Sequence, residues 1–460
     1  MKIFNTLTRT KEELKPINEG QLRIYACGPT VYNFIHIGNA RPLCVFDVLR
    51  RYLEWRGMDV KFVQNFTDID DKLIKKANEE GITVKEVAER YIEEFWTDAK
   101  GLNVREASVH PKATENIDAI IELIKSLEEK GYAYKSSNGD VYFKAKEFKS
   151  YGKLSHQPLE DLEAGARIDV SEIKQDPMDF CLWKSEKPGE PYWESPWSNG
   201  RPGWHIECSA MAGRFLGDTI DIHCGGQDLI FPHHENEIAQ SECAHGCDFA
   251  HYWMHNGYIN VDNRKMSKSL GNFFTVRDVA NVYGYEPIRY LMISSHYRSP
   301  INYSTDIIEQ GKSALERLYN CREGLIFALD HAEDGGEAPE FLEKHKEEFI
   351  TAMDDDLNTA DALAAIFTLA KDINIMVANG AKKGELEASL KVFDELCDVL
   401  GILYNKKEEN LDAEVEDLIE KRTEARKNKN WAEADAIRDK LKEMGIVLED
   451  TAQGVKWSRI

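Results

Sequence analysis

Apolar and polar residues alternate over residues 21–26, and a second apolar run covers residues 60–66. Such runs are typical of β-strands. Between them, residues 42–55 carry apolar side chains at helical spacing, and the pattern stops at Gly57. Pro42 suits the first turn of this helix, because its missing N–H would have no partner there in any case. The pattern therefore predicts a strand, a helix and a strand, the unit from which parallel α/β sheets are built.

The turn that joins the first strand to the helix, residues 27–41, carries chemistry of its own. Ligands of open α/β sheets bind at such turns, where backbone N–H groups at the helix N-terminus face an anion. His36 can hydrogen-bond a phosphate, Gly38 has no side chain to block a ligand, and Asn39 offers an amide. We interpret the turn as a phosphate-binding site. By themselves, a packed histidine and a turning glycine explain these residues equally well.

The rest of the chain divides into stretches of different pattern. Helical spacing dominates residues 71–132, whereas six prolines between residues 151 and 202 interrupt any regular pattern, as is typical of an insertion. The sheet is predicted to resume with a strand at residues 219–223, followed by a helix from Pro232. The last predicted elements are a helical bundle over residues 341–404 with a break at 354–359, then two helices divided at 428–430 and a short strand pair.

Composition narrows the class of protein. The 460 residues are 42% hydrophobic, enough for several domains with cores of their own. No apolar run approaches the length of about 18 residues that spans a membrane, and residues 1–16 lack a secretory pattern, so we expect a cytoplasmic protein. Nine scattered cysteines favour free thiols or metal ligation over disulfides. The net charge of −23 argues against a broad nucleic-acid-binding surface but permits a local basic site.

A second candidate for phosphate binding lies in the polar stretch Lys-Met-Ser-Lys-Ser at residues 265–269. Lys265 and Lys268 are three residues apart, and ammonium groups on a loop of small residues can close over a polyphosphate as mobile point charges. Together with the turn at residues 36–39, this stretch predicts that the protein binds a nucleotide.

One candidate metal site is dispersed along the sequence. Cys27 follows the first strand, and Cys208 lies in a predicted helix over residues 204–215. His233 and Glu237 are four residues apart and therefore share one face of the next helix. Thiolate, imidazole and carboxylate are all ligands of zinc.

A rival set is clustered within nine residues and consists of Cys243, His245, Cys247 and His251. On local spacing alone, this cluster is closer to an ordinary zinc site than the dispersed set is. The residues themselves leave three possibilities open: the dispersed site, the clustered site and no metal.

The motifs at residues 36–39 and 265–269, in this order, resemble the signature of class I aminoacyl-tRNA synthetases. Asn39 stands where that signature usually has a second histidine; it can donate to a phosphate but carries no charge. Four further segments resemble the cysteinyl-tRNA synthetases: Cys27-Gly-Pro-Thr-Val-Tyr32, Asn65-Phe-Thr-Asp-Ile-Asp-Asp71, Gly203-Trp-His-Ile-Glu-Cys208 and Phe231-Pro-His-His-Glu-Asn-Glu237. Four such segments in order make the resemblance specific.

The resemblance implies an ATP-dependent ligase that activates L-cysteine and transfers it to tRNA(Cys). It implies one Zn²⁺ per chain, held by Cys27, Cys208, His233 and Glu237, with Mg²⁺ accompanying ATP. The clustered cysteines and histidines become helix-end and surface residues. The zinc would distinguish cysteine from serine, because a thiolate is a far stronger ligand than a hydroxyl. We expect a monomer with no membrane partner.

The resemblance also assigns roles to single positions. Catalysis on the phosphates falls to His36, Asn39, Lys265 and Lys268, and further ATP contacts fall to Gly38, Asp228 and Lys268. The amino-acid pocket is expected to include Thr67, Trp204 and His223. Residues 421–431 form the most basic stretch and, in isolation, are typical of a solvated helix face. In a synthetase they predict anticodon contacts by Arg426, Trp431, Asp435 and Asp450.

We therefore expect an α/β protein with a Rossmann-type parallel-sheet catalytic domain that contains an insertion, followed by an α-helical bundle and a small C-terminal anticodon-binding domain. The expected boundaries are 1–115 and 203–262 for the two halves of the catalytic domain, 116–202 for an insertion that contacts the tRNA acceptor end, 263–303 for the lysine loop, 304–404 for the bundle and 405–460 for the anticodon-binding domain.

Two other functions fit parts of the sequence. One is a ligase of the same fold that joins cysteine to an amino sugar, which the complete C-terminal region disfavours. The other is a non-enzymatic module that binds zinc and a nucleotide, which the intact lysine motif disfavours.

Overall fold

The computed structural model describes residues 1–157, 173–261, 264–265, 274–406, 413–444, 446–451 and 454–459, without the side chains of 264–265, 413–416, 449–451 and 454–459. The chain forms two compact units. The first comprises Met1–Ser313, Ile350–Leu363 and Val399–Ile402, and the second Ala314–Phe349, Ala364–Asp398 and Leu403–Ile460. No helix among the described residues is long and apolar enough to cross a membrane.

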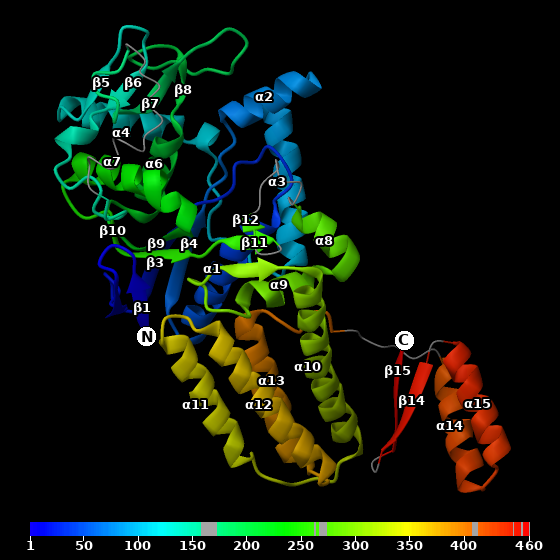
Figure 1. Ribbon diagram of the computed structural model, residues 1–460. Helices are drawn as coiled ribbons and strands as arrows, with labels where there is room; N and C mark the ends of the chain where they lie inside the picture. Colours follow the sequence, from blue (N-terminus) through cyan, green and yellow to red (C-terminus); the bar gives the residue numbers. More distant parts are fainter. Residues whose placement is uncertain are drawn as a thin grey trace. The chain divides into compact units, whose positions relative to one another are not determined.

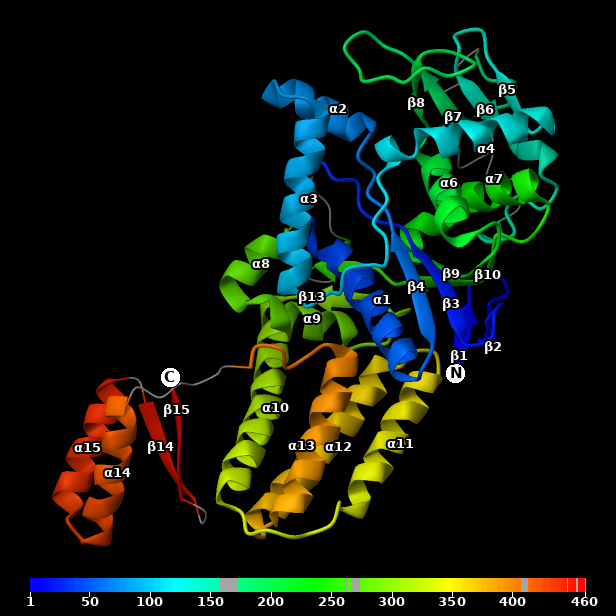
Figure 2. The ribbon, with the colours of Figure 1, turned by 180° about the vertical axis from the view of Figure 1, so that it is seen from behind.

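A parallel sheet forms the centre of the first unit (Figure 1). Its strand order is β10 (Ala250–Asn256), β9 (Ile220–Gly226), β3 (Gln21–Ala26) and β4 (Asp59–Gln64), and every neighbouring pair is parallel. Helix α1 (Ile37–Trp55) joins β3 to β4 and lies against the sheet (Figure 2). The predicted strand–helix–strand unit and the α/β class are therefore confirmed.

Helix α1 begins earlier than the apolar pattern predicts. It starts at Ile37, so Pro42 lies inside the helix, and its placement in the first turn was wrong. The side chain of Asn39 explains the early start, because its Oδ1 accepts a hydrogen bond from the backbone N of His36 at 3.1 Å and caps the new turn. Pro42 has no N–H to donate, so the carbonyl of Gly38 lacks its usual helical partner.

Two helices, α2 (Asp71–Glu80) and α3 (Val84–Gly101), follow β4 and pack against each other. The proline-rich stretch lies in a separate layer. There α4 (Ile117–Glu129) shares a hydrophobic core with an antiparallel sheet of β5 (Ala133–Lys135), β6 (Val141–Phe143), β7 (Phe180–Ser185) and β8 (Gly200–Pro202). Helices α6 (Trp204–Leu216) and α7 (Glu235–His245) contact α4, and α6 also contacts β3 and β4. This arrangement confirms an insertion with structure of its own.

Two features near the sheet were not predicted. The charged N-terminal stretch forms a hairpin of β1 (Lys2–Asn5) and β2 (Thr10–Glu13), and β1 packs beside β10. Strand β10 itself was also missed. Its residues are buried from Tyr252 to Asn256, so no alternation of polar positions marks that stretch.

Beyond the sheet, β11 (Ile259–Val261), β12 (Arg264–Lys265) and β13 (Ile301–Tyr303) form a small sheet near α8 (Val276–Tyr283) and α9 (Tyr285–Ile293). The helices α10 (Thr305–His331), α11 (Glu340–Asp354), α12 (Thr359–Ala378) and α13 (Lys383–Leu400) confirm the helical region and its break. The last part contains α14 (Ala413–Lys427), α15 (Trp431–Glu443), β14 (Ile446–Thr451) and β15 (Gly454–Arg459), as the pattern predicts.

Candidate active site

A cavity of about 510 Å³ opens at the carboxyl ends of the parallel strands. Residues after β3, β9 and β10 line it, together with the first turns of α1, α2 and α6. This is the edge at which open parallel sheets bind their ligands. His36, Gly38, Asn39, Asp228 and Trp204 all line the cavity, so the structure brings these predicted residues together.

The turn at His36 is held by the segment that follows the lysine loop. The backbone N of Ile37 donates to the carbonyl of Phe274 at 3.0 Å, and the N of Val276 donates to the carbonyl of Ile35 at 2.9 Å. The turn at residues 35–37 and the segment at residues 274–276 are thus paired directly. The side chain of Lys265 and all of Lys268 lie outside the described residues.

Beside this cavity, four potential ligand atoms converge from four segments: the turn after β3 (Cys27), α6 (Cys208), the helical turn Ile230–His234 (His233) and α7 (Glu237). Cys27 Sγ lies 3.8 Å from Cys208 Sγ and 3.5 Å from Glu237 Oε1, and His233 Nε2 lies 3.1 Å from the same oxygen. All four atoms are within 4.8 Å of one another. Cys208, His233 and Glu237 are buried, while Cys27 also lines the cavity. The dispersed set is therefore a group that could hold a metal ion.

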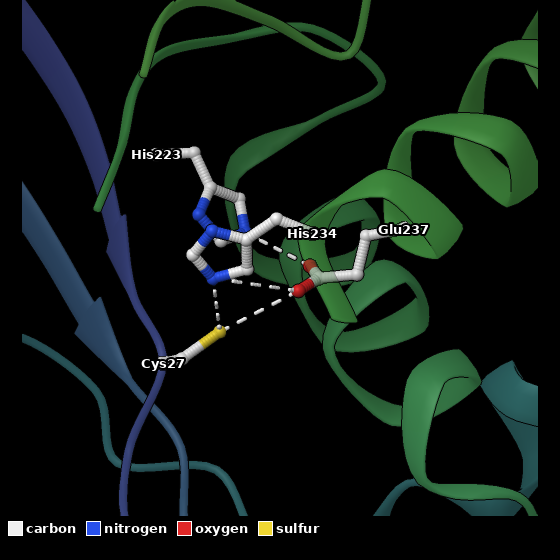
Figure 3. A group of neighbouring side chains, drawn as sticks. All are labelled: Cys27, His223, His234 and Glu237. Atoms are coloured by element: carbon white, nitrogen blue, oxygen red, sulfur yellow. Dashed lines mark hydrogen bonds and ion pairs between the residues drawn. The ribbon is translucent and has the colours of Figure 1, made fainter. Parts of the chain in front are cut away.

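A second group overlaps the first and shares Cys27 and Glu237 with it (Figure 3). His234 Nε2 lies 3.4 Å from Cys27 Sγ, and His223 Nε2 lies 2.8 Å from Glu237 Oε2. On the other side of its ring, His234 Nδ1 lies 2.8 Å from His255 Nε2. The sequence analysis left His234 out of the ligand set and did not consider His255, which lies near the carboxyl end of the unpredicted strand β10 at the same sheet edge.

The close packing of these groups shifts their pKa values. Burial would raise the pKa of Glu237, but His223 and His233 outweigh it and hold that pKa at about 2. A hydrogen bond from Cys27 lowers the pKa of Cys208 to about 6, against the effect of its burial. Burial would lower the pKa of His233, yet Glu237 and Cys208 raise it to about 10. At neutral pH the anionic groups of Glu237 and Cys208 outnumber the protonated imidazole of His233, so the group carries a net buried negative charge, which suits a cation.

Of the three residues predicted for the amino-acid pocket, one lines the cavity and two are buried. Trp204 lines the cavity, is 39% exposed and stacks on His233 with ring centres 4.2 Å apart. Thr67 and His223 are buried instead. Thr67 Oγ1 donates to Glu207 Oε2 at 3.0 Å, and His223 reaches Glu237. Glu207 is a further buried carboxylate that the sequence analysis missed, one position before Cys208.

The rival cluster does not converge. Cys243 is buried in the apolar core between α4 and α7, Cys247 is exposed and accepts from Thr219 Oγ1 at 3.3 Å, and His251 is exposed on β10. His245, the last residue of α7, has its Nδ1 3.4 Å from Asp218. Among the described residues, these four do not form a group of potential metal ligands.

The residues expected to read the anticodon lie in the last part of the chain. Trp431 begins α15 and is 58% exposed, and Asp435 on the same helix lies 3.2 Å from Arg438. Arg426 is half-buried near the end of α14. The side chain of Asp450 lies outside those described. A small core of Leu418, Leu441 and Ile446 joins the two helices to β14.

Comparison with known proteins places this fold in a class. Residues 13–313 match the family model of the tRNA synthetases class I (C) catalytic domain. The methionyl-tRNA synthetase of Mycobacterium tuberculosis, solved in complex with methionyl-adenylate, shares the fold with a TM-score of 0.61 at 17% identity, over 83% of this chain and 89% of that one. The LeuRS of Agrobacterium radiobacter K84, solved with tRNA and LeuAMS, has a TM-score of 0.62 at 12% identity, over 85% and 86% of the two chains. The catalytic unit is that of a class I aminoacyl-tRNA synthetase.

More similar proteins define the family within that class. Residues 348–404 match the DALR domain, and residues 408–457 match the cysteinyl-tRNA ligase anticodon binding domain. The chain is 58% identical to the cysteine–tRNA ligase of Clostridioides difficile (strain 630) and 56% identical to that of Caldicellulosiruptor saccharolyticus, over the full length of all three chains. The chain belongs to the cysteinyl-tRNA ligase family.

Proposed function

We propose that this protein activates L-cysteine with ATP to cysteinyl-adenylate and transfers the cysteinyl group to tRNA(Cys), using one zinc ion held by Cys27, Cys208, His233 and Glu237. The observation that carries the proposal is the convergence of two thiols, an imidazole and a carboxylate at the wall of the nucleotide-binding edge of the sheet. Family membership supplies the reaction class.

The distances between the ligand atoms support zinc. A tetrahedral zinc ion with ligands at about 2.0–2.3 Å needs ligand atoms about 3.3–3.8 Å apart. The separations of 3.8 Å between the two sulfurs and 3.5 Å between Cys27 Sγ and Glu237 Oε1 fit this requirement, and 3.1 Å between His233 and Glu237 is slightly short. Small movements on binding would therefore suffice.

Hydrogen bonding favours this group over the overlapping one. If Glu237 binds the metal through Oε1, its Oε2 remains free to accept from His223 at 2.8 Å, as observed. Metal-binding carboxylates are commonly held by such an outer partner. If His223 were itself a ligand, that hydrogen bond would be lost, and Cys208 would lie beside the ion without binding it. His223 is therefore assigned as the support of Glu237 and His234 as a neighbour of the site.

When bound, zinc supplies an open position at which a thiolate binds far more strongly than a hydroxyl, which is the difference between cysteine and serine. Five ligands are within the range of catalytic zinc, so four protein ligands leave room for a substrate sulfur. Thr67, Trp204 and His223 shape this pocket, with Trp204 at the cavity wall and the other two behind it.

The cavity lining supplies what activation needs without a protein nucleophile. The first turn of α1 brings the positive end of the helix dipole to the phosphates of ATP, with the side chains of His36 and Asn39 beside it. Gly38 lies under the adenine, Asp228 contacts the ribose or the substrate amine, and Mg²⁺ accompanies ATP. Lys265 and Lys268 close over the phosphates and stabilise charge that develops in the transition state.

The remaining regions serve tRNA in this proposal. The insertion, residues 116–202, contacts the acceptor end, and residues 405–460 read the anticodon. An exposed Trp431 suits stacking on an unpaired base, and Arg426 can pair with guanine, with Asp435 and Asp450 nearby. A ligase that joins cysteine to an amino sugar has no use for such a region. We propose a cytoplasmic monomer.

The test is cysteine-dependent exchange between ATP and pyrophosphate, followed by charging of tRNA(Cys). We expect exchange with cysteine and very little with serine, because a hydroxyl lacks the affinity of a thiolate for the metal. Chelation of the metal should remove the difference between the two amino acids along with the activity. Equal exchange with serine would contradict zinc as the reader of the substrate, and exchange without charging would contradict tRNA as the acceptor.

A further inference from the structure

One cationic side chain in the cavity has no part in the chemistry described so far. Lys72 lies in the first turn of α2 and is the only lysine or arginine among the described residues that line the cavity. Its Nζ lies 5.3 Å from the centre of the Tyr32 ring, which also lines the cavity. A cation over an aromatic face at this distance is attracted to it, so the ammonium is held near the cavity while remaining exposed.

The charges around Lys72 leave its ammonium available to an anion. The neighbouring carboxylate, Asp71, is already neutralised by Lys184 Nζ at 2.8 Å and Arg201 Nη2 at 2.5 Å. Asp70 is turned to the helix, where its Oδ1 accepts from the backbone N of Lys72 at 2.8 Å. No carboxylate among the described residues forms an ion pair with Lys72.

The position of Lys72 indicates which anion it meets. Lys184 and Arg201 belong to β7 and β8 of the insertion, so their ion pairs with Asp71 connect the insertion to the first turn of α2 at the cavity. ATP phosphates already have the first turn of α1. An RNA strand must enter from outside, over the surface of a chain whose net charge is −23, and an exposed cation at the cavity wall gives one of its phosphates a partner.

We infer that Lys72 binds a backbone phosphate near the 3′ end of tRNA and positions the terminal ribose for aminoacyl transfer. The inference rests on the proposed function and adds a substrate contact to it. In the transfer step the ribose hydroxyl oxygen bonds to the carbonyl carbon of the adenylate, and the bond from that carbon to the phosphate oxygen breaks. AMP leaves with its phosphate taking up the hydroxyl proton, while Lys72 only holds the nucleophile in place. Lys72 therefore matters for transfer and not for activation.

The experiment compares Lys72→Ala with Lys75→Ala in the full-length metal-loaded enzyme. Lys75 is an exposed lysine one turn further along α2 that lies 3.8 Å from Glu79, so its removal controls for a lost charge on the same helix. Single-turnover transfer from preformed cysteinyl-adenylate to tRNA(Cys) should slow on the order of tenfold to a hundredfold in Lys72→Ala, the range for a lost charged hydrogen bond. Pyrophosphate exchange should stay within about twofold of the wild type, and Lys75→Ala should leave both steps unchanged.

Two further measurements separate phosphate binding from a structural effect. Loss of one contact to a single strand should reduce the slope of log affinity for tRNA against log salt by about 0.7. Lys72→Arg should recover most of the transfer rate, because it keeps the charge. The inference is overturned if exchange falls as much as transfer, which would place Lys72 on ATP or cysteine, or if transfer and the salt slope do not change. Failure of the proposed function is distinct, because the wild type itself would then show no cysteine-dependent exchange.

Discussion

The dispersed group and the clustered set of potential zinc ligands differ in how sequence separation relates to distance in space. Cys27, Cys208 and Glu237 span 210 positions of the chain, yet their side chains meet in one buried group. Cys243 and Cys247 lie on or just beyond one helix, yet one enters an apolar core while the other faces solvent. Closeness in sequence therefore says little here about closeness in space.

The difference follows from the two kinds of backbone. The carboxyl ends of parallel strands lie along one edge of a sheet, so residues that follow β3 and β9 are brought together whatever their separation in sequence. Successive residues of a helix instead point in different directions, and only those three or four apart share a face. His233 and Glu237 obey this rule and lie 3.1 Å apart, whereas His245 points to Asp218.

The largest expected effect comes from replacing a cysteine of the dispersed group and comparing it with the same replacement in the clustered set. Cys208→Ser should abolish tight zinc binding and reduce cysteine-dependent pyrophosphate exchange by several orders of magnitude, because a buried hydroxyl is a poor ligand. Metal content measured by atomic absorption, together with exchange, tests this directly. The matched variants Cys243→Ser and Cys247→Ser should keep about one zinc per chain and normal exchange.

The opposite outcome is equally informative. If Cys247→Ser released the zinc while Cys208→Ser retained it, the clustered set would be the metal site, and the dispersed group would be a buried polar network only. A variant that keeps zinc but loses exchange would instead show that Cys208 matters to the substrate and not to the ion.

The sequence was sufficient for three of the four strands of the parallel sheet and for the members of the dispersed group, but not for the fourth strand or for the side chains around the group. Helical spacing alone places His233 and Glu237 together, and the strand pattern places Cys27 at the sheet edge. The choice of that group over the cluster required the resemblance to a family, because the convergence of Cys208 with Cys27 depends on tertiary packing that no local pattern contains.

The missed parts have physical reasons. Helix α1 starts at Ile37 because a side-chain cap by Asn39 extends it past the apolar pattern, an effect that hydrophobic spacing does not register. Strand β10 is buried on both faces, so it lacks the alternation of a half-exposed strand. Without that strand, the partner of His234, His255, could not be placed near the group.

A smaller effect should follow from the support of the metal ligands. His223→Asn removes the hydrogen bond to Glu237 Oε2 without touching an assigned ligand, so zinc affinity should fall by about tenfold to a hundredfold, the range for outer partners of metal ligands. His251→Asn, at the exposed position of β10, should leave the affinity unchanged. Competition with a chromophoric chelator measures both. Complete loss of zinc from His223→Asn would instead favour the overlapping group, in which His223 is a ligand.

The smallest effect concerns His110, a half-buried histidine that belongs to neither set, and it shows how partial burial shifts the pKa of an imidazole that lies away from potential metal ligands. His110 Nε2 accepts from the backbone N of Ala107 at 2.8 Å, and its Nδ1 donates to the carbonyl of Gln64 at 2.9 Å. The ring also stacks on Phe66.

Burial lowers the pKa of His110 to about 4, and protonation would place a second N–H against that of Ala107. The unfolded chain, with a histidine pKa of about 6.5, binds this proton first, so stability is fully present above that pH and is lost as pH falls toward 4. Between pH 7.5 and 5.5 the loss should be about 1.3 kcal/mol in the free energy of unfolding. His110→Gln, which can donate and accept but does not titrate, should lack this loss, whereas His251→Gln should retain it. Urea unfolding of the three proteins at both pH values measures the difference, and equal pH dependence in wild type and His110→Gln would show that His110 is protonated in the folded state.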